Sequence, residues 1–184
     1  MNHHEEGVRE VLDFWFGPGR DKQWFVRSDS FDAEVKEVMG PWCQRARNGE
    51  LESWRETPEG TLALVLLLDQ VPRHLHRNSA EAYSSDKQAR EVALAAVEAG
   101  MDQDLEASRR LFLYLPLEHS EELADQEQAV ALISRLGDAE ATRYAVLHRD
   151  IIARFGRFPH RNQALGRETT PEEAEFLKQP DSSF

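Results

Sequence analysis

The sequence lacks the features that stabilise secreted proteins or anchor proteins in membranes. Cys43 is the only cysteine among 184 residues, so neither an intramolecular disulfide nor a cysteine-based zinc cluster can form. The longest apolar run, residues 62–68, has seven residues, whereas a membrane span needs about 20. The first ten residues, MNHHEEGVRE, are acidic where a signal peptide is basic and then apolar. We therefore predict a cytoplasmic protein that does not enter a membrane.

Positive charge is also scarce. The chain has 22 lysines and arginines against 34 aspartates and glutamates, which gives a net charge of −12 at pH 7. A field of this sign repels the phosphates of nucleic acids and the headgroups of anionic membranes. The composition therefore disfavours both as partners.

Recognised cofactor and nucleophile motifs are missing as well. The chain has no glycine-rich phosphate loop, no nucleophile elbow and no dinucleotide fingerprint, and "GPGR" at 17–20 follows no predicted strand. We predict no bound cofactor.

Helical periodicity dominates what is present. Apolar residues recur at three- and four-residue spacing, glycines and prolines fall between these runs, and no segment alternates as a strand does. We predict one all-α domain over residues 1–184, with seven to eight antiparallel helices and a short C-terminal helix and tail from about residue 170. Two prolines are predicted to end helices. The nearly all-apolar central helix, 61–71, ends before Pro72, and a shorter helix, 105–115, is closed by Pro116.

Several longer phrases resemble one known family. They are "VLDFWFG" (11–17), "LALVLLLDQVPR" (62–73), "YLPLEHSEELADQ" (114–126), "HRDIIARFGRFPHRN" (148–162) and "LGRETTPEEAEFL" (165–177). In this order they resemble the uncharacterised bacterial family called domain of unknown function 924. The resemblance implies a tetratricopeptide-like, all-α superhelix and no established activity.

One basic segment stands out in this acidic chain. Residues 143–167 contain six arginines and a single acid, Asp150, and the segment 154–167 reads "RFGRFPHRNQALGR". Arginines here have two open interpretations. They either form ion pairs with the acidic helices, or they present planar donors to the carboxylate or phosphate of a ligand.

Histidines and one aspartate complete the candidate residues. His119 and Glu122 are spaced to share a helix face, as a histidine–carboxylate pair or as capping residues, and they supply too few ligands for a metal site. His148 lies on an apolar helix face, where a packing role is the alternative. Asp69 ends the most apolar helix and needs an arginine partner, which we expect to be Arg73, Arg154 or Arg157.

We predict that these residues gather on one concave face, and three functions remain open. The first is a binding module for an anionic small molecule or a peptide carboxylate. The second is a hydrolase-like enzyme in which histidine and glutamate act as general acid and base while arginines stabilise an oxyanion. The third is a structural or assembly role, and the sequence leaves the oligomeric state open. The candidate ligand-binding residues are Asp69, Arg73, His148, Arg154, Arg157 and Arg161, and the candidate catalytic residues are His119, Glu122 and His160.

Overall fold

Every regular element that the computed structural model describes, over residues 3–184, is a helix. Residues 1–2 of the predicted domain lie outside this range. The α-helices are α1 (His3–Trp15), α2 (Asp29–Arg47), α3 (Pro58–Val65), α4 (Val71–Leu75), α5 (Asp86–Glu98), α6 (Ala107–Glu118), α7 (Leu123–Ser134), α8 (Ala139–Phe155) and α9 (Pro171–Phe176). Short helical turns lie between them: η1 (Arg20–Lys22), η2 (Glu52–Glu56), η3 (Leu66–Gln70), η4 (Ala80–Tyr83), η5 (Met101–Asp104) and η6 (Pro159–Arg161). The predicted all-α fold is confirmed, and the tetratricopeptide-like superhelix stays a prediction.

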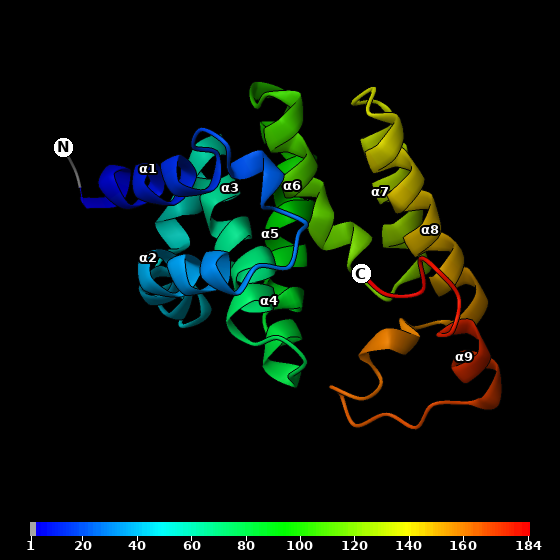
Figure 1. The fold of residues 1–184 in the computed structure, drawn as a ribbon. Coiled ribbons are helices and arrows are strands. Elements are labelled where there is room, and N and C mark those ends of the chain that lie inside the picture. The colour runs from blue at the N-terminus through cyan, green and yellow to red at the C-terminus, as the bar shows by residue number, and fades with distance from the viewer. Residues whose placement is uncertain (1–2) are drawn as a thin grey trace.

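The helices pack around one continuous core. Figure 1 shows α1 to α4 on one side of α5 and α6, with the pair of α7 and α8 on the other side. The main cluster of buried apolar residues draws on all of α1 to α8. A smaller cluster, formed by Ile151, Ile152 and Phe158 together with Phe176, holds α9 and the basic segment against the end of α8. The basic segment is therefore part of the packed domain.

The central helix does not end before Pro72. Helix α3 continues through η3, a single π-helical turn, into α4, which contains the proline. Proline has no N–H to donate to the carbonyl four residues before it, here that of Leu68. The Ser85 hydroxyl donates to that carbonyl instead, at 2.7 Å. Because the lost hydrogen bond is replaced, the helix passes the proline and places Asp69 in its wide turn.

Pro116 does not close its helix either. Helix α6 runs to Glu118 and His119 follows as its C-cap. A proline inside a helix costs at least one backbone hydrogen bond. All residues from Phe112 to Glu118 are buried, and this burial offsets the loss. The extension carries Glu118 and His119 into the centre of the molecule.

Helix α1 approaches two tryptophans closely at Gly7. A Cβ atom at this position would lie 2.5 Å from a ring carbon of Trp42 and 2.9 Å from one of Trp54. These distances are too short for a real contact, so any side chain at Gly7 pushes α1 away from α2 and η2.

We expect Gly7→Ala to lower the free energy of unfolding by about 1–3 kcal/mol through overpacking, although alanine favours helix. Urea denaturation measures the change. The double variant Gly7→Ala/Trp42→Phe should recover part of the loss, because the smaller ring vacates the space. An unchanged or higher stability of Gly7→Ala would contradict this packing.

Candidate functional site

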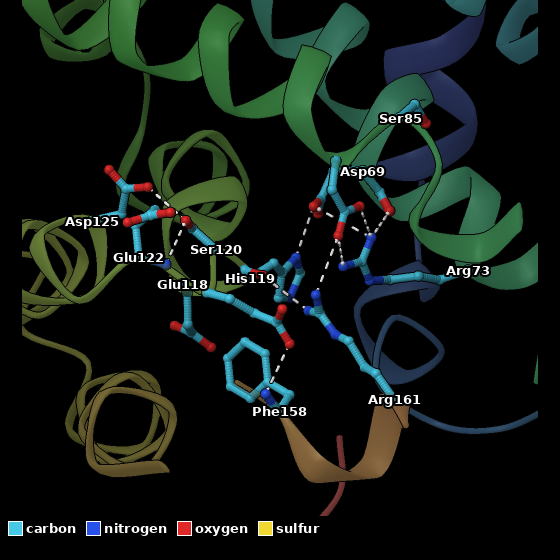
Figure 2. A network of polar contacts seen from close by, with 12 residues as sticks. Asp69, Arg73, Ser85, Glu118, His119, Ser120, Glu122, Asp125, Phe158 and Arg161 are labelled. Atoms are coloured by element: carbon cyan, nitrogen blue, oxygen red, sulfur yellow. Dashed lines mark hydrogen bonds and ion pairs between the residues drawn. The ribbon is translucent and has the colours of Figure 1, made fainter. Parts of the chain in front are cut away.

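Eight polar residues from six elements meet where the end of α6 faces η3, α4 and η6. We call this group the polar cluster. Its members are Asp69, Arg73, Asp86, Glu118, His119, His148, His160 and Arg161. Figure 2 shows His119 and Arg73 pointing toward Asp69 from different segments, with Arg161 reaching the His119 end of the group from η6. Six of the nine candidate residues thus lie close together, and their role as one functional face stays a prediction.

Asp69 is completely buried and makes the central contacts. Its carboxylate lies 2.7 Å from Nδ1 of His119 and 3.5 Å from Nη1 of Arg73. Burial alone would raise the pKa of Asp69, but His119 and Arg73 hold this pKa well below its usual range. Asp69 is therefore a buried, ionised carboxylate that these two partners stabilise, and the Gln70 side-chain amide also donates to it at 2.7 Å.

Arg73 donates hydrogen bonds to two different segments of the chain. Its guanidinium donates to both carboxylate oxygens of Asp86, at 2.8 and 3.0 Å, and to the backbone carbonyl of Asp69 at 2.6 Å. The expected arginine partner of Asp69 is thus Arg73. This contact joins the π-helical turn to the first residue of α5.

Arg161 is held between two aromatic rings. Its guanidinium carbon lies 4.6 Å from the ring centroid of Tyr83 and 4.6 Å from that of Phe158. Nη2 donates to the backbone carbonyl of His119 at 2.9 Å, while Nε is buried without a partner in the described part of the chain. Burial, with some repulsion from Arg73, lowers the pKa of Arg161 to about 10.

Glu118 and His148 form a second buried pair. Oε1 of Glu118 lies 3.2 Å from Nδ1 of His148, which also donates to the Tyr144 carbonyl at 2.8 Å. Burial and the nearby charge of Asp69 raise the pKa of Glu118 to about 8. Burial and the nearby His119 lower the pKa of His148 to about 3, so at neutral pH both side chains are mostly uncharged.

His160 is the third histidine of the polar cluster. Its Nδ1 atom is buried and has no hydrogen-bond partner among the described residues. Burial, together with the charge of Arg161, lowers the pKa of His160 to about 3. The ring of Phe158 lies between His160 and His148, at 5.6 Å from each by ring centroids.

Three candidate residues lie outside the polar cluster. Glu122 is exposed just before α7. The carboxylate that contacts His119 is that of Asp69 rather than that of Glu122, because the end of α6 turns the imidazole ring toward η3. Arg154 pairs with Glu172 at 2.9 Å, and Arg157 with Glu173 at 2.7 Å. These two arginines fasten the segment around α9 to the end of α8, so the ion-pair interpretation applies to them.

Sequence reasoning missed Asp86, Glu118 and Tyr83. Asp86 is the first residue of α5, and an acid in the first turn of a helix has an ordinary structural role there. Glu118 carried a usable signal, because it is an acid beside a run of apolar residues in "LFLYLPLEH". Its burial became foreseeable only with α6 extended past Pro116.

Surface cavities lie away from the polar cluster. One of about 570 Å³ is lined by Arg157, Arg167, Glu168, Thr169, Thr170 and Pro171. Another, of about 610 Å³, lies between α1 and η2. Within residues 3–184 no group of three or more histidine, cysteine, aspartate or glutamate side chains is arranged to hold a metal ion.

None of the described helices has the length and apolar character needed to cross a membrane.

We expect the unfolding free energy of the Glu118→Gln variant to rise relative to that of the wild type as the pH increases. The folded chain keeps the Glu118 proton up to about pH 8, whereas the unfolded chain releases it near 4.5. The unfolding free energy of the wild type therefore falls across this range, by up to about 1.4 kcal/mol per pH unit. Urea denaturation at pH 5, 6.5 and 8 measures the difference, with Glu122→Gln as the exposed control. If the difference in unfolding free energy between the variant and the wild type does not change with pH, Glu118 is not buried in its neutral form.

Comparison with known proteins places the chain in a family. The family model described as "Bacterial protein of unknown function (DUF924)" matches residues 11–181. No curated protein matches the chain. The solved structure of a protein of unknown function, ATU0120 from Agrobacterium tumefaciens, is 41% identical, with a TM-score of 0.90, over 95% of this chain and 98% of that one. The chain therefore belongs to the DUF924 family of bacterial proteins.

Proposed function

We propose that the polar cluster binds the carboxylate or phosphate of a small molecule or of a peptide end, and that Arg161 is the main contact. One observation carries this proposal. Within the segment 154–167, every arginine except Arg161 has a carboxylate oxygen within 3 Å. The corresponding distance from Arg161 is 3.6 Å, to Asp86, and that carboxylate already binds Arg73 through both oxygens.

An incompletely compensated cation in the interior costs free energy. The Arg161 side chain is 8% exposed, so water replaces little of the missing partner. A buried charge is tolerated when it is paired and hydrogen-bonded. A bound anion supplies that pairing, and the low pKa of Arg161 is consistent with a cation that lacks it.

The guanidinium is also ready for binding before a ligand arrives. The rings of Tyr83 and Phe158 both pack against it, and the His119 carbonyl fixes one end. A side chain that is already ordered loses little conformational entropy on binding. Planar, fixed donors are suited to carboxylate and phosphate groups.

A ligand reaches the polar cluster from one edge. Asp69 and Glu118 are buried, whereas Tyr83, His160 and the neighbouring Arg73–Asp86 pair are partly exposed. The side chains of Arg73 and Asp86 are 21% and 20% exposed. The proposed anion enters along this edge and meets Arg161 behind it.

A structural role is the second candidate function. Arg161 reaches from η6 to the His119 carbonyl at the end of α6, and both aromatic contacts tie the same segments together. In this case Arg161 only fastens the C-terminal part of the chain to the rest of the domain.

Anion binding predicts that phosphate or succinate raises the melting temperature, while chloride at equal ionic strength does not. At 100 times its dissociation constant a ligand adds about 2.7 kcal/mol, and a domain of this size gains about 2–4 °C per kcal/mol. Arg161→Lys keeps the charge but loses the planar donors, so it should remove most of the shift. Arg157→Lys is the matched control and should keep it.

The structural role predicts a different result. All anions then leave the melting temperature unchanged, and Arg161→Lys lowers it in every buffer. Differential scanning fluorimetry separates the two outcomes, and isothermal titration with phosphate checks the binding directly.

A further inference from the structure

His119 has the geometry of an oriented base. Its Nδ1 atom lies 2.7 Å from the buried, ionised carboxylate of Asp69. A carboxylate only accepts hydrogen bonds, so Nδ1 carries the proton and Nε2 keeps its lone pair. Nε2 has no hydrogen-bond partner among the described residues, and the His119 side chain is 14% exposed. The lone pair is thus not taken up by another group of the described chain.

His119 and Arg161 belong to the same small site. Nη2 of Arg161 donates to the backbone carbonyl of His119, so the base and the proposed anion contact are fixed to one residue. Gln126 holds this turn from behind, because its side-chain amide donates to the carbonyls of Glu118 and Ser120, on either side of His119. The position of the imidazole is therefore set from three directions.

A second aspartate–histidine pair in the chain has a more enclosed, aromatic environment. Nδ1 of His74 lies 2.7 Å from Asp32, the same distance as in the His119 pair. Arg77 also binds Asp32, and the His74 ring packs edge-on against the rings of Trp15 and Phe31. The side chain of His74 is 6% exposed and that of His119 is 14%.

The charged and titratable groups around His119 come from every element packed against it. They are Asp69, Arg73, Asp86, Glu118, His148, His160 and Arg161. Burial, helped by the charge of Arg73, lowers the pKa of His119 below its usual 6.5 despite the attraction of Asp69. At pH 7 the imidazole is neutral and able to accept a proton.

We propose that His119, positioned by Asp69, is the general base for hydrolysis of an ester whose carboxylate or phosphate is held by Arg161. This inference rests on the proposed anion site. The oxygen of a water molecule forms a bond to the acyl carbon, and the water proton passes to Nε2 of His119. The bond from that carbon to the alcohol oxygen then breaks, and His119 returns the proton to the departing alkoxide.

The products are a carboxylic acid and an alcohol, and no group is oxidised or reduced. The negative charge that develops on the carbonyl oxygen lies in the field of Arg73 and Arg161. Asp69 remains ionised throughout and acts as a positioning residue. The reaction requires water as its only co-reactant.

The test uses mono-4-nitrophenyl succinate, an activated ester that carries a carboxylate, with 4-nitrophenyl acetate as the uncharged comparison. We expect the wild type to prefer the succinate ester in kcat/KM, and His119→Gln to lower that value by about 100-fold or more. His74→Gln is the matched control and should keep the activity. Arg161→Lys should remove the preference for the charged ester.

Two further measurements identify the role of Asp69. The kcat/KM of the wild type should stay level from pH 8 to 6.5 and fall below 6.5, because the base must be neutral, and His119→Gln should lack this fall. Nitrogen-15 NMR should show His119 as the Nδ1–H tautomer. Both measurements use proteins with an intact Asp69, so they hold even if Asp69→Asn does not fold.

The outcomes separate this inference from the anion site. If phosphate raises the melting temperature but His119→Gln hydrolyses the ester as fast as the wild type, the catalytic role is wrong and the binding site stands. If hydrolysis depends on His119 but not on Arg161, the anionic substrate class is wrong. The Nε2–H tautomer at His119 would overturn the inference whatever the rates.

Discussion

The buried carboxylate of Asp69 is the constraint around which the centre of this protein is arranged. An ionised group with no access to water must be paired, and its partners come from elements far apart in the chain. His119 supplies one contact from the end of α6, fifty residues away, and Arg73 supplies another from α4, one turn after Asp69 itself. Through Arg73 the first residue of α5 joins as well. A single buried charge thus ties together the segments that form the site.

The wide turn that carries Asp69 follows from Pro72. A proline in the middle of a helix leaves one carbonyl without its donor, and in this chain the Ser85 hydroxyl takes that place. The π-helical turn ends two residues before the proline, and π-helical turns are frequent at functional sites. The backbone irregularity and the buried carboxylate therefore lie at one place, and this agrees with a site rather than a plain packing helix.

The basic segment divides into two groups of arginines with different tasks. Arg154 and Arg157 are neutralised by Glu172 and Glu173, which face them from α9. Arg161 turns the other way, into the polar cluster, where it lacks a carboxylate of its own. Arg161 lies four positions after Arg157, and Gly156, which ends α8 with φ of 69°, lets the chain change direction between α8 and η6. Arg154 and Arg157 lie on either side of that turn and both pair with α9, so the place of each arginine in the folded chain, rather than residue type, decides its partners.

The sequence alone determined the helical class, because the spacing of apolar residues is a local property of the chain. It also singled out six of the eight residues of the polar cluster, because an acid at the end of an apolar helix, histidines on helix faces and clustered arginines in an acidic chain stand out in the sequence. It misjudged the helix ends at Pro72 and Pro116, because a replacement donor such as Ser85 and the burial of a whole turn come from distant segments.

Tertiary structure alone decided the pairings. Glu122 is three residues from His119, yet Asp69, fifty residues away, takes the imidazole. Ion pairs and hydrogen bonds depend on where side chains meet in space, and that follows from the packing of whole helices rather than from the residues next to them.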